Sequence, residues 1–271
     1  MLVVKNLYVK YPETTEYALK NISFSSTPGE LVLIAGPSGS GKTTLARAIA
    51  GFIPSFYKAE ISGEIKLFNR DPISEGISSL RGIVGFVGQN PEMFVTSLTV
   101  FEEIALPLIN LGYPKEYILK RVKEVARDLG IYDLLDRLTL ELSAGQLQKV
   151  SIASALALNP KVLVLDEPLA RLDKISSRFI SSLLKKIAKK SKIVLVFEHH
   201  LDEILPLADK VIVLNRGKKM CEGTPREVVE HLLNIDVPEI TEAFYLAGFK
   251  NLPISVMEAV KHYDSIKKRL V

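Results

Sequence analysis

Near its N-terminus the sequence has a short apolar run that leads directly into a glycine-rich segment and then into a helical pattern. The apolar run is Leu31–Ala35, the glycine-rich segment is Gly36–Thr43, and the helical pattern is Lys42–Ala50. A short strand that is apolar on both faces is typical of a parallel sheet covered by helices. The order of strand, glycine-rich loop and helix therefore predicts an α/β fold.

The glycine-rich segment fits the pattern G-x-x-x-x-G-K-[ST], in which a curled backbone points successive N–H groups at phosphate oxygens. Its residues are Gly36, Pro37, Ser38, Gly39, Ser40, Gly41, Lys42 and Thr43. Lys42 is expected to reach the β- and γ-phosphates of a nucleotide, and the Thr43 hydroxyl is expected to hold Mg²⁺. The predicted nucleotide site extends to Thr44, in the first turn of the helix, whose positive end attracts phosphate. A merely flexible glycine loop is the alternative.

A second apolar run, Val162–Leu165, ends in two acidic residues, Asp166 and Glu167. In an open parallel sheet, ligands bind at the carboxyl ends of the strands. Asp166 is expected to help hold Mg²⁺, and Glu167 to polarise the water that attacks the terminal phosphate. Because acidic strand ends are common, this prediction depends on the presence of the phosphate loop.

Further apolar runs extend the pattern along the chain. The remaining strand candidates are Leu2–Val9, Ala18–Ser25, a β pair at Glu64–Phe68 and Ile83–Val87, Ile193–Phe197, and Val211–Leu214. Residues from about Leu98 to Leu158 show helical spacing, and two or three short helical patterns follow Pro225. The alternation of strands and helix-length segments predicts a mostly parallel sheet with helices on both faces.

Charge and cysteine content limit the classes of function. Lys and Arg total 35 against 31 for Asp and Glu, a surplus too small to demand or to exclude nucleic acid. The single cysteine, Cys221, excludes an intrachain disulfide and a zinc site built on several thiolates. No run approaches the ~20 apolar residues that cross a bilayer, and the N-terminus lacks the features of a secretory signal. The sequence therefore predicts that any membrane association comes from a partner.

Residues 142–146 distinguish among the kinases, GTPases, recombinases and transport ATPases that share a phosphate loop. The segment Leu142-Ser143-Ala144-Gly145-Gln146 resembles the LSGGQ signature of ABC ATPases, and the order and spacing of the motifs also match that family. Ser143 can cap a helix that begins at Ala144. The resemblance implies that residues 143–146 bind the γ-phosphate of ATP held by a second subunit. Ala144 departs from the usual second glycine; alone, the segment could be an ordinary helix cap.

Two positions before the signature also match the family pattern. Tyr11 resembles the aromatic residue that stacks on adenine, although a tyrosine of the core or the surface would look the same. Gln89 resembles the glutamine that senses Mg²⁺ and the attacking water, at the start of the helical region that membrane partners touch. The resemblance implies that Gln89 is both a catalytic residue and a magnesium residue.

Two positions after the acidic strand end match as well. Asp173, in the segment Ala170–Asp173, resembles a residue of the loop that crosses to the other subunit, and Arg171 is bulkier than the residue usual at its position. His199 resembles the switch histidine that hydrogen-bonds the γ-phosphate. His200 is a competitor, but alignment through the following residues favours His199.

The resemblance, which covers about residues 1–223, implies a division of the chain. An ABC ATP-binding domain at 1–224 would combine the mostly parallel core sheet with an N-terminal antiparallel β subdomain and a helical signature subdomain at about 92–158. Residues 225–271 would form a short helical C-terminal appendage. Its segments around Pro238 and Pro253 resemble the tail of energy-coupling-factor ATPases, which energise uptake of vitamins and of cobalt or nickel ions.

The resemblance implies a magnesium-dependent ATP hydrolase that works by ATP-driven pairing of two subunits, with ATP and Mg²⁺ as cofactors. The expected partners are a second ABC ATPase subunit, identical or related, and integral membrane transporter subunits, with no nucleic acid. The expected location is the cytoplasmic face of the cell membrane. A soluble ABC ATPase acting on nucleic acid or ribosomes, or the ATPase of another importer class, is the alternative. The sequence holds no substrate pocket from which a cargo could be identified.

Overall fold

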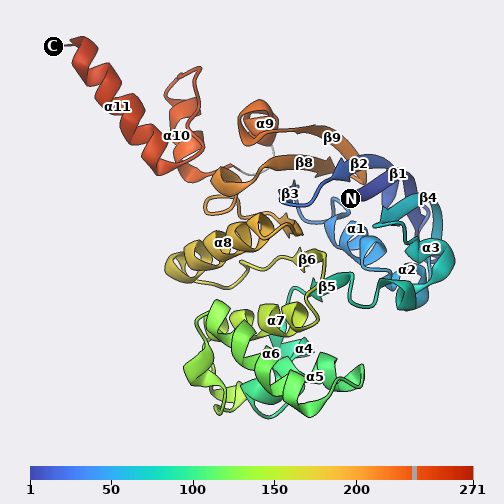
Figure 1. Ribbon diagram of the computed structural model, residues 1–271. Coiled ribbons are helices and arrows are strands. Elements are labelled where there is room, and N and C mark those ends of the chain that lie inside the picture. The colour runs from blue at the N-terminus through green and yellow to red at the C-terminus, as the bar shows by residue number, and fades with distance from the viewer. Residues whose placement is uncertain (234–236, 271) are drawn as a thin grey trace.

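The computed structural model describes residues 1–233 and 237–270, and within these residues it has two β-sheets flanked by helices. Figure 1 shows the six-stranded sheet at the centre, the antiparallel sheet near the N-terminus, and a separate group formed by α4, α5, α6 and α7. Helices α10 and α11 extend from the body at the C-terminal end. No helix in the described part of the chain is both long enough and apolar enough to span a membrane.

The antiparallel sheet has the order β2-β1-β4. Its strands are β1 (Leu2–Lys10), β2 (Leu19–Ser26) and β4 (Glu60–Leu67). In β1 the residues Leu2, Val4, Leu7 and Val9 are buried, and two register shifts against β2 accommodate the spacing of this apolar face. The sheet therefore presents one apolar face to the core.

The second sheet has the order β5-β6-β7-β3-β8-β9, and every pairing in it is parallel except that of β8 with β9. Its strands are β3 (Leu31–Ala35), β5 (Val84–Val87), β6 (Val162–Asp166), β7 (Ile193–Glu198), β8 (Lys210–Asn215) and β9 (Lys218–Gly223). All residues of β3, β6 and β7 are buried, as expected for central strands with helices on both faces. The loops after β3, β6 and β7 therefore leave the same edge of the sheet.

Two features of the sheets differ from the sequence prediction. The strands predicted at Glu64–Phe68 and Ile83–Val87 do not pair, because β4 joins β1 and β5 joins β6. Strand β9 was not predicted, because its exposed and half-buried residues carry charges and lack an apolar run. It pairs with β8 in an antiparallel hairpin through the turn at Arg216 and Gly217.

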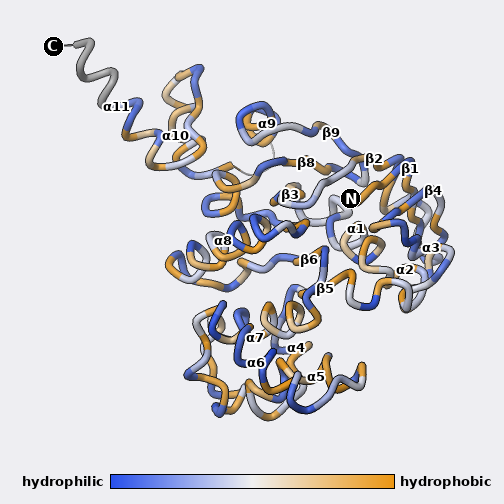
Figure 2. The backbone as a smooth tube through the Cα atoms, viewed as in Figure 1, coloured by the Kyte–Doolittle hydropathy of each residue, from blue (hydrophilic) through white to orange (hydrophobic). Residues whose placement is uncertain are grey.

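Helices flank the larger sheet, and α4, α5, α6 and α7 form the separate helical group. Their bounds are α1 (Lys42–Ile49), α2 (Phe52–Ser55), α3 (Pro72–Glu75), α4 (Pro91–Phe94), α5 (Val100–Asn110), α6 (Lys115–Asp128), α7 (Ala144–Ala157), α8 (Lys174–Lys189), α9 (Pro225–Leu232), α10 (Glu239–Leu246) and α11 (Val256–Leu270). Short 3₁₀ turns lie at Ile77–Leu80, Tyr132–Leu134, Thr139–Glu141 and Leu205–Leu207. Figure 2 shows hydrophobic and hydrophilic residues alternating along α8, as expected for a helix with one buried face.

The central strands divide their side chains between two apolar clusters, one on each face of the sheet. In β6, Leu163 and Leu165 belong to the cluster that α5, α7 and α8 cover, whereas Val162 and Val164 belong to the cluster shared with α1 and the antiparallel sheet. This alternation has the period of two expected for a strand. The central strands are therefore packed on both faces of the sheet.

The predicted C-terminal appendage, 225–271, contains α9, α10 and α11 in its described residues. Leu252 and Ile254 are buried and belong to the larger apolar cluster. Arg226 of α9 forms an ion pair of 2.6 Å with Glu258 of α11. The appendage thus packs against the body of the protein, while the domain boundary at 224 stays a prediction.

Candidate functional site

The phosphate loop connects β3 to α1, where the sequence predicted it. Lys42 begins α1, is 4% exposed, and donates hydrogen bonds from Nζ to the carbonyl oxygens of Gly36 (2.6 Å) and Pro37 (3.1 Å). Burial lowers the pKa of Lys42, whereas the nearby carboxylates of Glu167, Glu198 and Asp166 raise it. The lysine is therefore held inside the loop by carbonyl groups.

At position 41, near the end of the loop, neighbouring atoms leave no room for a side chain, so only glycine fits. Its φ of 103° lies in the left-handed region, and a Cβ there would stand 2.7 Å from the carbonyl oxygen of Ala18. The hydroxyl oxygen of Ser40 is buried and has no hydrogen-bond partner among the described residues. A buried polar atom without a partner is a group that a ligand can satisfy. This loop therefore fits a nucleotide phosphate.

Asp166 ends β6 beside Thr43, whose hydroxyl Oγ1 lies 3.2 Å from Asp166 Oδ1. Burial raises the pKa of Asp166 to about 6, and the hydrogen bond with Thr43 lowers it. Two hard oxygen ligands that lie close together, one of them buried, are suited to Mg²⁺. Thr43 and Asp166 are thus the residues that would hold the ion, and the ion would supply charge to the phosphates.

Glu167 lies one residue beyond β6 and contacts two other predicted catalytic residues. Gln89 Nε2 donates to Glu167 Oε2 at 2.6 Å, and His199 Nδ1 lies 3.3 Å from Glu167 Oε1. Glu167 has φ 50° in the left-handed region, and its N–H donates to the carbonyl oxygen of Phe197. This conformation is uncommon for a residue with a Cβ and is a feature of functional sites. The geometry places a carboxylate, an amide and an imidazole together.

Glu198, the last residue of β7, is a site residue that the sequence analysis missed. It is fully buried, and its two carboxylate oxygens accept hydrogen bonds from the backbone N–H groups of Leu169, His199 and His200. Burial raises its pKa to about 7, and these three hydrogen bonds lower it. The available signal was an acidic residue that directly follows an apolar strand.

Tyr11 follows β1 and lies at the edge of the site. Its hydroxyl is 3.3 Å from Thr44 Oγ1, so the residue predicted to stack on adenine contacts the residue predicted to border the phosphates. Tyr11 also packs against the apolar cluster shared by α1 and the antiparallel sheet. Its predicted contact with adenine stays a prediction.

The signature residues begin α7 on the helical group. Ser143 and Gln146 form a reciprocal capping box, in which Ser143 Oγ accepts from Gln146 N (3.3 Å) and Gln146 Oε1 accepts from Ser143 N (3.0 Å). A Cβ on Gly145 would stand 2.8 Å from Ser176 Oγ, so glycine allows α7 to approach α8 closely. Ser143 and Ala144 are exposed. The structure thus presents the N-terminus of a helix to solvent.

Asp173 caps α8 and lies near the start of α7. Its Oδ1 accepts from Ser176 N at 2.9 Å, and its Oδ2 accepts from Ser176 Oγ at 2.8 Å. Ser176 is the side chain that Gly145 approaches, so the predicted crossing loop and the signature lie on one continuous surface. Arg171 in this loop is exposed and has φ 64°.

The structure separates the predicted residues into two groups. The first group meets at the carboxyl edge of the sheet and contains Lys42, Thr43, Gln89, Asp166, Glu167 and His199. The second is the surface of Ser143, Ala144, Gly145, Gln146 and Asp173. Among the described residues, no hydrogen bond or ion pair joins the signature residues 143–146 to the phosphate loop.

A family model described as "ABC transporter" matches residues 19–170, more than half of the chain. The chain belongs to the ABC transporter family. The predicted resemblance to ABC ATPases is thereby confirmed, and ATP hydrolysis with ATP and Mg²⁺ is the activity of this family.

Relatives of known family agree with this assignment. A putative ABC transporter ATP-binding protein of Methanosarcina acetivorans is 35% identical over 274 residues, which cover 98% of this chain and 44% of the relative. A second, from Pyrococcus abyssi, is 34% identical over 233 residues, covering 86% of this chain and 83% of the relative. The ABC chain therefore spans less than half the length of the first of these relatives.

Solved structures confirm the fold class. Among them is cbiO1 from Clostridium perfringens, described as part of the ABC transporter complex cbiONQ, with a TM-score of 0.77, 32% identity, and coverage of 90% of this chain and 94% of cbiO1. Another is a dimeric ATP-binding cassette in a post-hydrolysis state bound to ADP and Pi, with a TM-score of 0.72, 31% identity, and coverage of 83% and 99%. The predicted α/β architecture with a mostly parallel core sheet is that of these cassettes.

Proposed function

We propose that this ABC chain is the ATP-hydrolysing subunit of a membrane transporter and that two such subunits close around ATP. The observation that carries the proposal is the arrangement beside the phosphate loop, in which Gln89 and His199 each lie within hydrogen-bond or ion-pair distance of Glu167. The dimeric cassette with ADP and Pi, to which the chain is similar, supports this reading.

In this proposal the phosphate loop binds the triphosphate through Lys42 and the N–H groups of residues 36–44. Binding replaces the carbonyl partners of Lys42 with phosphate oxygens, which form stronger, charge-assisted hydrogen bonds. Thr43 and Asp166 hold Mg²⁺, whose charge stabilises the phosphates. Tyr11 lies at the adenine side.

Glu167 is the proposed catalytic base, because a carboxylate beside the phosphate loop can accept the proton of the attacking water. Gln89 Nε2 donates to one of its oxygens at 2.6 Å, and His199 Nδ1 lies 3.3 Å from the other. His199 Nδ1 is buried and, although it lies near Glu167, makes no hydrogen bond in the described part of the chain, so it is available to hydrogen-bond the γ-phosphate. This geometry favours His199 over His200 as the switch histidine.

The second surface completes the site of the partner subunit. The exposed N-terminus of α7 offers N–H groups and the positive end of a helix dipole to the γ-phosphate bound by the other chain. Asp173 lies beside it through Ser176. ATP then joins two surfaces that do not meet within one chain, and loss of phosphate releases them.

The proposed transporter role rests on the family and on an apolar surface near Gln89. Met93, Phe94 and Leu98 follow Gln89 and are 76%, 54% and 62% exposed. An exposed apolar patch of this kind is typical of a docking site for another protein. We propose that integral membrane subunits dock here, which places the chain at the cytoplasmic face of the membrane.

The finer assignment is uptake of a vitamin or transition-metal ion by an energy-coupling-factor type complex. The similarity to cbiO1, which is part of an ABC transporter complex, and the predicted C-terminal tail support it. Residues 237–258 of that tail contain α10 and the start of α11.

The test is to tag the chain, extract it from native membranes in mild detergent, and identify the proteins that co-purify. Multispanning membrane proteins are expected, and their identity would define the cargo class. Replacing both Met93 and Leu98 with Asp should abolish this recovery, whereas the matched control Met220→Asp, at an exposed residue of β9, should not. Recovery of only soluble proteins or nucleic acid would overturn the transporter role and favour a soluble ABC ATPase.

A further inference from the structure

Glu198 lies at a point where two functional loops meet. One loop follows β6 and contains Glu167, Leu169 and Asp173, and the other follows β7 and contains His199. Glu198 Oε1 accepts from Leu169 N at 2.8 Å, while Oε2 accepts from His199 N at 3.0 Å and from His200 N at 3.3 Å. Each carboxylate oxygen thus serves a different loop.

The burial of Glu198 makes these hydrogen bonds essential. The residue is 0% exposed, and removing a carboxylate from water is costly unless hydrogen bonds compensate it. No lysine or arginine among the described residues forms an ion pair with it; the nearest cationic candidate is His199 Nδ1, at 3.9 Å from Oε2. Lys42 and Glu167 are the other charged groups that act on it. Backbone N–H groups from the two loops therefore do most of the compensation.

We propose that Glu198 is a positioning residue that holds the loop of Glu167 and Asp173 in register with the loop of His199. It acts through the backbone, because its partners are N–H groups rather than reacting atoms. The N–H of Glu167 is fixed by the preceding residue of β7, Phe197, so the end of this one strand orients both loops. This inference rests on the proposed function, since it assigns Glu198 to the same hydrolytic site.

The substitution Glu198→Gln tests whether Glu198 positions the two loops or is merely a buried residue. The Glu198→Gln side chain has almost the same shape, but only one of its two terminal atoms accepts a hydrogen bond. Its amide nitrogen must therefore face a backbone N–H of one loop, leaving that donor without a partner. The matched control is Glu103→Gln, since Glu103 is 5% exposed and accepts from Thr96 N and Ser97 N through the single atom Oε2. One amide oxygen can replace that acceptor.

The first measurement is backbone amide exchange of the wild-type and variant chains without nucleotide. Glu198→Gln should raise the exchange of Leu169, or of His199 and His200, by about tenfold or more, because a buried donor loses its acceptor. Exchange in the phosphate-loop segment 36–45 should stay at the wild-type rate. Glu103→Gln should leave both loops unchanged. Wild-type exchange in both loops of Glu198→Gln would overturn the proposal.

The second measurement is steady-state ATP hydrolysis. In Glu198→Gln, kcat should fall about tenfold or more while KM for ATP changes less than about threefold, because misplaced catalytic groups affect turnover rather than ground-state binding. A purely structural residue would lower the amount of folded protein and leave kcat per folded molecule unchanged, and that result would overturn the proposal.

Two further points keep the test decisive. If Glu198→Gln does not fold, Glu198→Asp retains both oxygens on a shorter side chain that cannot reach both loops, and wild-type exchange and kcat in that variant would overturn the proposal. Amide exchange needs no turnover, so absence of ATP hydrolysis by the wild-type chain would count against the proposed function alone.

Discussion

Charged side chains lie at both edges of the parallel sheet, but the two edges differ in how many of their polar groups have hydrogen-bond or ion-pair partners. At the carboxyl edge, Asp166 and Glu198 are buried with raised pKa values, and Ser40 Oγ has no hydrogen-bond partner among the described residues. At the amino edge, a cavity of about 320 Å³ lies between α6, α7 and α8. Most of its charged side chains have protein partners.

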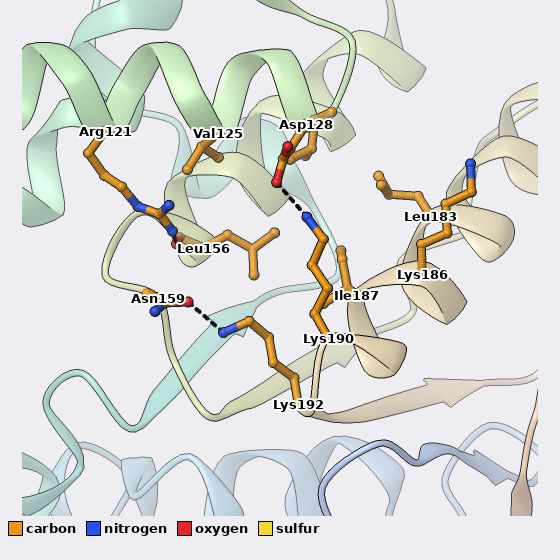
Figure 3. A pocket seen from close by; sticks show the side chains of 11 residues that line it. Arg121, Val125, Asp128, Leu156, Asn159, Leu183, Lys186, Ile187, Lys190 and Lys192 are labelled. Carbon is orange, nitrogen blue, oxygen red and sulfur yellow. Dashed lines mark hydrogen bonds and ion pairs between the residues drawn. The ribbon is translucent and has the colours of Figure 1, made fainter.

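Figure 3 shows this amino-edge cavity, in which the side chains of Arg121, Lys190 and Lys192 are directed at neighbouring groups. Lys190 pairs with Asp128 at 2.7 Å, and Lys192 donates to Asn159 Oδ1 at 2.8 Å. Arg121 donates to the carbonyl oxygens of Leu156 and Ala157, which end α7. Here the cationic side chains bind carbonyl, amide and carboxylate groups at helix ends and in loops, which is a structural role.

A ligand site and a structural scaffold can thus be distinguished at the two edges of one sheet. The cavity is well formed at the amino edge, yet most of its charged side chains are already paired. The carboxyl edge instead leaves buried polar atoms unpaired and carboxylates partly desolvated, a state that stabilises the fold less and suits a bound nucleotide and ion. Variants at the two edges should therefore affect different quantities.

The largest expected effect is on turnover at the carboxyl edge. Glu167→Gln should lower kcat for ATP by at least about 10²-fold, because the amide cannot accept the proton of the attacking water. ATP binding should persist, since the phosphate loop is unchanged. Phosphate release and binding of a fluorescent ATP analogue measure the two quantities. Normal turnover in this variant would show that Glu167 is not the base. Glu222→Gln in β9 is the control.

A second effect concerns stability and its pH dependence. Because the folded pKa of Asp166, about 6, lies above its ordinary value of 3.8, the folded chain binds this proton more tightly than the unfolded chain. Its contribution to stability is complete below about pH 4 and is lost as pH rises through 6. Without Mg²⁺ and nucleotide, Asp166→Asn should stabilise the chain by about 1–3 kcal/mol at pH 8 and much less at pH 4. Thermal unfolding at both pH values measures this. An equal effect at both would contradict the prediction.

Scaffold contacts at the amino edge should change stability and spare activity. Arg121→Ala removes two hydrogen bonds of 2.9 Å to the last carbonyl groups of α7, so the free energy of unfolding should fall by about 1–2 kcal/mol. kcat per folded molecule should remain within about twofold of wild type. Denaturant unfolding and ATP hydrolysis test the two parts. The control is Lys120→Ala, at an exposed neighbour.

The smallest effect is expected at the ion pair between Asp128 and Lys190, whose side chains are 60% and 62% exposed. An exposed pair is screened by water and salt, so Asp128→Asn should cost about 0–0.5 kcal/mol and leave ATP hydrolysis unchanged. Denaturant unfolding at low and high salt measures it. A loss of hydrolysis here would break the distinction between the two edges.

Much of the carboxyl edge could be predicted from sequence because its residues follow recognisable local patterns. The phosphate loop joins a strand to a helix, and Asp166 ends an apolar run; the structure brings Thr43 within 3.2 Å of Asp166, while the roles predicted for these residues stay predictions. Each of these positions depends on neighbours within the same few residues.

The missed features depend on contacts between distant segments. Glu198 looked like the first residue of a loop, because only the N–H group of Leu169 and those of its own loop make its burial possible. Strand β9 has exposed charges and forms only against β8. Residues 64–68 and 83–87 are close in sequence, which suggested that they pair with each other. In the structure they belong to two different sheets, because β4 pairs with β1 and β5 pairs with β6.

The capping box at the start of α7 has a consequence for how this family can diverge. Because the side chains of Ser143 and Gln146 are occupied with the helix end, the atoms presented outward are main-chain N–H groups. Every amino acid except proline supplies such a group. The position of Ala144 can therefore accept other small residues, whereas a Cβ at Gly145 would require the Ser176 side chain, 2.8 Å away, to move.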